Sequence, residues 1–153
     1  MRRTVVACSV LALLIFAGLI SAQSRKAVPQ KSSQIERGKY LVENVGMCQD
    51  CHSPRNERGE YIKERWLHGA PVLFKPSADI PWAPLAPPLA GLVGYTDEQA
   101  MKFLTTGVNS TGGHPRPPMP EYRLNRDDAA AVIAYLRSLP PPKNPRETAA
   151  TGE

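Results

Sequence analysis

The stretch GMCQDCHSP, residues 46–54, decides how the rest of this chain is interpreted. It places Cys48 and Cys51 three positions apart and follows them immediately with His52. Cys-X-X-Cys-His is the attachment pattern of haem c, because two thiols at this spacing can add to the two vinyl groups of one porphyrin. The histidine then lies beneath the iron. The stretch therefore predicts one covalently bound haem, with His52 as an axial iron ligand.

Two other kinds of site use the same residue types. A zinc ion would take Cys48 and Cys51 with His52 and a second histidine, either His68 or His114, although adjacent Cys and His side chains rarely chelate one ion well. A redox-active thiol pair belongs in a βαβ frame, and the chain shows no such pattern. Both sites stand as alternatives to haem.

The opposite face of the iron needs a second ligand, for which the chain offers Met47, Met101, Met119, His68 and His114. Met47 adjoins the attachment motif, and Met101 falls in a predicted helix, where methionine is more often a core residue. Met119 lies in HPRPPMPEY, whose prolines forbid helix and stiffen the backbone. We expect Met119 as the sixth ligand, with His114 or an open position as the alternatives.

Ligation by His52 and Met119 indicates an electron carrier. A soft thioether favours ferrous iron and raises the reduction potential, and full coordination leaves no position for a substrate. The chain is then expected to be no enzyme itself, but a carrier or a subunit of an oxidoreductase complex. The alternative is a haem enzyme or gas sensor, which requires an open or displaceable sixth ligand.

The beginning of the chain has the pattern of an export signal over residues 1–24. Two arginines precede an apolar run over residues 5–20, and small residues follow it. Cleavage is expected after Ala22 or Ser24. The alternative is a retained membrane anchor at residues 4–22, which is nearly long enough to cross a bilayer. Either way, we expect a periplasmic or otherwise exported domain.

Cysteine usage and charge limit the class of partner. Cys8 lies inside the apolar run, so the exported chain keeps only Cys48 and Cys51 and has no larger disulfide framework. The formal net charge of +5 falls to +3 without residues 1–24, with 17 basic against 14 acidic residues. The basic residues form no dense run, which argues against nucleic acid as a partner and leaves a mildly basic docking face.

Residues 34–139 are predicted to form one domain, between a flexible linker at 25–33 and a proline-rich flexible tail at 140–153. Three helices are expected from their capping residues and apolar stripes: from Ser33 with Glu36 to Gly46, from Thr96 with Gln99 to Gly107, and from about Asn125 to Leu139. No run alternates as a strand would, so the fold class is all-α. The long Pro- and Gly-rich loops between these helices would be organised by a large buried cofactor.

Three stretches, in this order and spacing, resemble the class I c-type cytochromes, which are monohaem proteins. RGKYLVENVGMCQDCH resembles the first helix and attachment site of that family, and PPLAGLVGYTDEQAMKFL resembles its proline-leucine-glycine segment and the helix after it. PPMPEYRLNRDDAAAVIAYLRSL resembles the methionine loop and terminal helix. The resemblance covers nearly all of residues 34–139 and implies the cytochrome c fold, with helices wrapped around a covalent haem.

The resemblance also assigns roles to particular residues. It implies that Gly38 of the first helix packs against Tyr135 of the last. It further implies that the carbonyl of Pro87 accepts a hydrogen bond from the unligated ring nitrogen of His52, which would fix the orientation of the ring. Cys48, Cys51, His52, Pro87 and Met119 are thus the expected haem-binding residues, and His52 and Met119 the iron ligands.

Residues 53–86 depart from the small members of that family, because the segment is much longer. It is more similar to single-haem subunits that serve multi-component periplasmic dehydrogenases. This implies a dehydrogenase as electron donor and an oxidase or another cytochrome of a respiratory chain as acceptor, with the membrane reached only through the N-terminal segment. Trp66 and Trp82 would cover the haem edge or bind its propionates, or else pack the insertion on itself.

Overall fold

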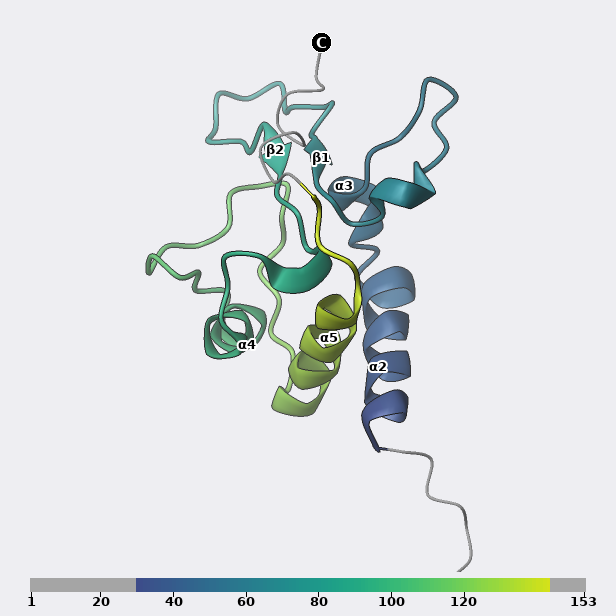
Figure 1. Ribbon diagram of the computed structural model, residues 1–153. Helices are drawn as coiled ribbons and strands as arrows, with labels where there is room; N and C mark the ends of the chain where they lie inside the picture. The colour runs from purple at the N-terminus through teal and green to yellow at the C-terminus, as the bar shows by residue number, and fades with distance from the viewer. Residues whose placement is uncertain (1–29, 144–153) are drawn as a thin grey trace, which may run out of the picture. The chain divides into compact units, whose positions relative to one another are not determined.

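The computed structural model describes residues 30–143, and helices dominate this part of the chain (Figure 1). The α-helices are α2 (Gln30–Tyr40), α3 (Gln49–His52), α4 (Asp97–Thr106) and α5 (Arg126–Ser138). A π-helical segment, η2 (Leu41–Val45), continues α2, and short 3-10 turns occur at η3 (Lys63–Arg65) and η4 (Ala90–Leu92). The strands β1 (Ala70–Pro71) and β2 (Leu85–Ala86) form one antiparallel pair. The all-α prediction is confirmed.

The second and third predicted helices have the predicted caps. The hydroxyl of Thr96 accepts a hydrogen bond from the Gln99 backbone, and the Gln99 side chain accepts one from the Thr96 backbone. This capping box satisfies two N–H groups that would otherwise lack partners. Gly107, in the left-handed conformation, ends α4. Asn125 caps α5 by accepting from the backbone of Asp128.

The first helix differs from the prediction at both ends. It begins at Gln30, so Ser33 lies inside α2, and residues 30–33 of the predicted flexible linker are helical. Its far end widens into η2, where the Gly46 N–H donates to the carbonyl of Leu41, five residues earlier. The left-handed backbone that follows is at Met47, with φ of 45°, and not at Gly46. The helix therefore changes from α to π geometry just before the cysteine motif.

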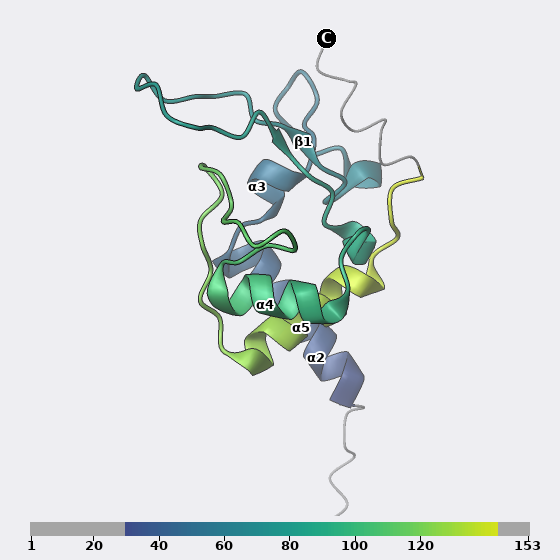
Figure 2. The same ribbon diagram turned by 90° about the vertical axis from the view of Figure 1, so that its left-hand side faces the viewer.

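Helix α5 is the centre of the core. Its apolar stripe is buried at Ala129, Val132, Ile133 and Leu136, and Leu139 just beyond its end is partly buried. In both views α5 lies beside α2, and α4 passes across its other side (Figures 1 and 2). The contact of Gly38 with Tyr135 is present: a Cβ atom added to Gly38 would lie 1.9 Å from the carbonyl oxygen of Ala131 and 2.8 Å from the Tyr135 Cβ.

The end of the described chain also packs on the domain. The carbonyl of Pro140 lies 3.2 Å from His68 Nε2, and Pro142 is buried. A Cβ atom added to Gly91 would meet Pro141 at 2.8 Å. Residues 140–142 of the predicted flexible tail therefore contact the domain. Residues 144–153 lie outside the described part of the chain.

None of the helices found within residues 30–143 is long and apolar enough to cross a membrane. The predicted signal or anchor at residues 1–24 lies outside the described residues, so both alternatives remain predictions.

Candidate haem site

The attachment motif occupies one tight turn of helix. Cys48 is the N-cap of α3, and Cys51 and His52 form its last half. The Cys48 N–H donates to the carbonyl of Val42 at 2.9 Å, which ties α3 to the wide end of η2. Cys48, Cys51 and His52 are therefore held on a rigid segment that is continuous with the core helices.

His52 makes the contact that the sequence predicts. Its Nδ1 lies 2.7 Å from the carbonyl oxygen of Pro87. A carbonyl can only accept, so Nδ1 carries the proton and Nε2 keeps its lone pair. The residue is 5% exposed, and burial lowers the pKa of its imidazole, an effect that the hydrogen bond to Pro87 partly offsets. His52 is thus held as a neutral imidazole with one free nitrogen, which is the form that binds a metal.

Gly69, which the sequence analysis missed, brings Pro87 to the histidine. The Gly69 N–H donates to the carbonyl of His52 at 2.8 Å. Its φ is 87°, and an added Cβ atom would lie 2.8 Å from the carbonyl oxygen of Ala86 and 3.1 Å from the Pro87 carbonyl carbon. Only glycine fits this approach without strain. A lone glycine in a long loop gives no sequence signal for such a role.

Tyr122 is the second residue that the sequence analysis missed. Its hydroxyl donates to the carbonyl of Gly46 at 3.1 Å. Burial, followed by the neighbouring Cys48, raises the pKa of Tyr122 to about 12. The tyrosine therefore joins the methionine-bearing segment to the attachment turn, although 76 positions separate Tyr122 from Gly46.

The state of the thiols bears on the two alternative sites. Cys48 and Cys51 are both free, and burial raises the pKa of the Cys48 thiol. A redox-active pair needs a lowered thiol pKa, so the dithiol alternative loses support.

Within residues 30–143 no three His, Cys, Asp or Glu side chains gather as a metal site would require. His68 lies against Pro140 and His114 pairs with Glu121, so neither completes a zinc site.

Met119 is half-buried in the proline-rich segment. A turn holds its backbone, because the Met119 N–H donates to the carbonyl of Arg116 at 3.1 Å. The Ala83 N–H donates to the carbonyl of Pro117 at 2.8 Å, which fastens the end of the long insertion to this turn. Met119 as iron ligand stays a prediction.

The aromatic residues of the insertion pack among themselves. The indole N–H of Trp82 donates to the carbonyl of Phe74 at 2.8 Å, and the two rings meet edge to face. Trp66 meets Tyr61 in the same way, with ring centroids 5.3 Å apart, and packs against the core. Trp82 thus packs within the insertion, whereas Trp66 also contacts the core; a role for either tryptophan at the haem edge stays a prediction.

The residues present fit a covalently attached haem. Two unpaired thiols and an imidazole with one free nitrogen lie on the same turn, and a backbone carbonyl fixes the ring. This donor set matches thioether attachment with axial histidine ligation.

The family model named Cytochrome c matches residues 35–140. The chain belongs to the cytochrome c family. It is 35% identical over 113 residues to a diheme cytochrome c-type protein of Cereibacter sphaeroides, covering 69% of this chain and 35% of that one. It is 29% identical over 122 residues to the fructose dehydrogenase cytochrome subunit of Gluconobacter japonicus, covering 76% and 24%. The cytochrome c subunit of the quinone-type alcohol dehydrogenase of Gluconacetobacter polyoxogenes is 32% identical over 127 residues, covering 74% and 26%.

The matched region spans about a third or less of the length of each of these relatives. The predicted resemblance to c-type cytochromes and to cytochrome subunits of dehydrogenases is confirmed. Members of this family carry covalent haem c, so the chain is an electron-transfer protein of the haem c type.

Proposed function

We propose that this chain carries single electrons on one haem c, held by thioether bonds from Cys48 and Cys51 and ligated by His52 and Met119. The hydrogen bond from His52 Nδ1 to the Pro87 carbonyl, made on the same turn as the two free thiols, is the observation that carries the proposal. When bound, the haem iron accepts one electron from a donor and passes it to an acceptor.

The protein's own residues have three tasks in this function. The Pro87 carbonyl retains the proton on Nδ1, so His52 presents Nε2 and stays neutral. The thioether of Met119 would be the second iron ligand, which would favour the ferrous state and leave no position for a substrate. The stiff turns around both ligands limit their movement when the charge on the iron changes. Together these tasks describe a carrier and not an enzyme.

The partners proposed are proteins. The fructose and alcohol dehydrogenase relatives are named as cytochrome subunits, which supports a dehydrogenase as donor; an oxidase or another cytochrome would be the acceptor. The protein is proposed to act in the periplasm, with residues 1–24 as an export signal or a membrane anchor. Weak, rapid docking over a small area suits a protein that must release each partner after one electron.

Two experiments test this function in protein produced by a host that matures c-type cytochromes. Intact mass should show one haem, and replacing both Cys48 and Cys51 with alanine should abolish the covalent addition. The oxidised spectrum should show a sulfur-to-iron charge-transfer band that Met119→Ala removes and Met101→Ala keeps. A band that survives Met119→Ala would overturn the ligand assignment, and a colourless product would overturn the haem. A parent protein without the band would favour the alternative with an open sixth position.

A further inference from the structure

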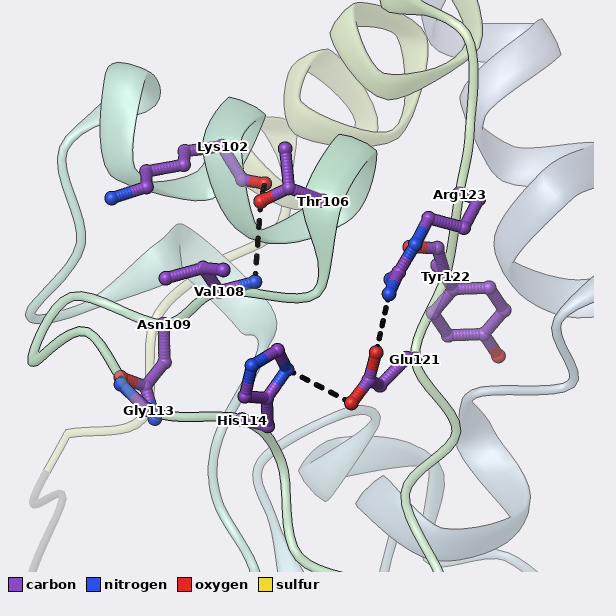
Figure 3. Close-up of polar contacts among 9 residues, drawn as sticks. All are labelled: Lys102, Thr106, Val108, Asn109, Gly113, His114, Glu121, Tyr122 and Arg123. Atoms are coloured by element: carbon purple, nitrogen blue, oxygen red, sulfur yellow. Dashed lines mark hydrogen bonds and ion pairs between the residues drawn. The ribbon is translucent and has the colours of Figure 1, made fainter.

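The segment that carries Met119 is closed at its base by a contact between the side chains of His114 and Glu121. His114 Nδ1 lies 2.9 Å from one carboxylate oxygen of Glu121, and Arg123 donates to the other oxygen (Figure 3). Met119 lies between His114 and Glu121 in the chain, so their contact turns residues 114–121 into a closed loop. Closing a loop removes conformations from it, and the prolines within it remove more.

The closed loop is also attached to the end of α4. An added Cβ atom at Gly107 would lie 2.5 Å from Arg123 Nη1 and 3.0 Å from Glu121 Oε2, so both side chains lie against this helix end. The Leu124 N–H donates to the carbonyl of Leu104 at 3.0 Å. Arg123 lies at the C-terminus of α4, where the partial negative charge of the helix end favours a cation. The Glu121 contacts therefore connect the loop to a core helix.

We propose that Glu121 is a positioning residue for Met119: by holding His114 and Arg123 it slows the departure of the thioether from the iron. The inference rests on the proposed ligation by His52 and Met119. The side chains of His114, Glu121 and Arg123 are 56%, 38% and 55% exposed, so each contact alone is weak in water. The effect comes from where the contacts lie, across the base of the loop that bears the ligand.

The rate of thioether departure can be measured directly. In the oxidised, haem-loaded protein, imidazole binds only after the sulfur leaves, so the limiting rate at saturating imidazole reports its departure. Glu121→Gln should raise this limiting rate about threefold to tenfold, the size expected for losing two partly exposed side-chain contacts. His114→Gln should raise it less, because the contact with Arg123 remains. High salt should raise the rate of the parent and leave that of Glu121→Gln nearly unchanged.

Glu57→Gln is the matched control. It makes the same change of charge at an exposed site for which the described residues show no side-chain contact. Both variants should have the urea midpoint of the parent, so a difference in the limiting rate would reflect the loop and not global stability. If Glu121→Gln fails to load haem, His114→Gln carries the test.

A limiting rate equal to that of Glu57→Gln, with the charge-transfer band intact, would overturn the role of Glu121 and leave the ligation standing. Absence of the band from the parent would instead overturn the ligation itself.

Discussion

Gly38 of α2 lies in direct backbone contact with Ala131 of α5. A Cβ atom at residue 38 would stand 1.9 Å from the Ala131 carbonyl oxygen and 2.5 Å from its carbonyl carbon. The obstacle is backbone, which cannot turn aside as a flexible side chain does. This crossing fixes the distance between α2, which leads to the haem-attachment turn, and the helix at the centre of the core.

Gly38→Ala is therefore expected to destabilise the haem-loaded protein by about 3 kcal/mol or more, because the two helices must separate. Gly113→Ala is the control, since the nearest atom to its added Cβ is 3.5 Å away and belongs to the Asn109 side chain. It should change the free energy of unfolding by no more than about 0.5 kcal/mol. Urea unfolding followed by circular dichroism compares them. Equal midpoints would contradict the close crossing.

Tyr122→Phe is expected to cost about 1 kcal/mol of unfolding free energy, because it removes the hydroxyl that donates to the Gly46 carbonyl. The ring and its packing remain. Tyr40→Phe removes a hydroxyl from a tyrosine that is 53% exposed and should have no measurable effect. Thermal unfolding of the haem-loaded variants measures both. A neutral Tyr122→Phe would mean that the hydroxyl contributes nothing to the attachment turn.

Arg137 joins α5 to the turn before α4. Its guanidinium donates to the Asp97 carboxylate and to the backbone carbonyls of Gly91, Leu92 and Tyr95. Lysine cannot reproduce this planar set of donors, so Arg137→Lys should destabilise the protein by about 1–3 kcal/mol. Arg126→Lys, at an exposed position of the same helix, should be neutral. Denaturant titration of both variants measures the difference. Equal midpoints for Arg137→Lys and Arg126→Lys would count against a stabilising role for the Arg137 hydrogen bonds.

The ion pair between Arg37 and Asp128, 2.9 Å apart, predicts a dependence of stability on pH. The hydrogen bond from Arg37 lowers the pKa of the Asp128 carboxyl below its usual value. A carboxyl whose pKa is lower in the folded state stabilises the fold above its unfolded pKa of about 4, and the stabilisation disappears as the pH falls through the folded pKa. Arg37→Gln should thus be less stable than the parent at pH 7 and equal to it at strongly acidic pH.

Lys39→Gln controls for that experiment, because it removes a positive charge from another exposed position of α2. The difference in stability between Lys39→Gln and the parent should not disappear as the pH falls through the folded pKa of Asp128, whereas that of Arg37→Gln should. Urea midpoints measured at several pH values give the comparison. An Arg37→Gln deficit that stays constant into acid would show that Asp128 is not the group involved.

Some features were predictable because they depend on neighbours in the chain. The Thr96 and Gln99 box forms between residues three apart, and the Asn125 cap acts in the same local way. The family match over residues 35–140 likewise bears out the order of motifs that the sequence suggested. The start of α2 at Gln30 was missed, because Ser33 is compatible with a cap and also with a helix interior.

Contacts between distant segments were harder to predict. Gly69 and Tyr122 carry no recognisable pattern, yet one lets the backbone reach Pro87 and the other bonds the carbonyl of Gly46. Similarly, nothing local marks Glu121 as the residue that holds both His114 and Arg123. Such contacts exist only once the loops are folded over the helices.

The order of residues was enough to define the chemistry of this protein: which sulfurs and which imidazole stand together, and where α4 and α5 begin, because spacing and caps act over a few positions. The approach of Gly69 to Pro87, the hydrogen bond from Tyr122 to Gly46 and the closure of the Met119 loop came from the folded chain alone. These features depend on atoms from remote parts of the chain meeting at van der Waals or hydrogen-bond distance, which no local pattern records.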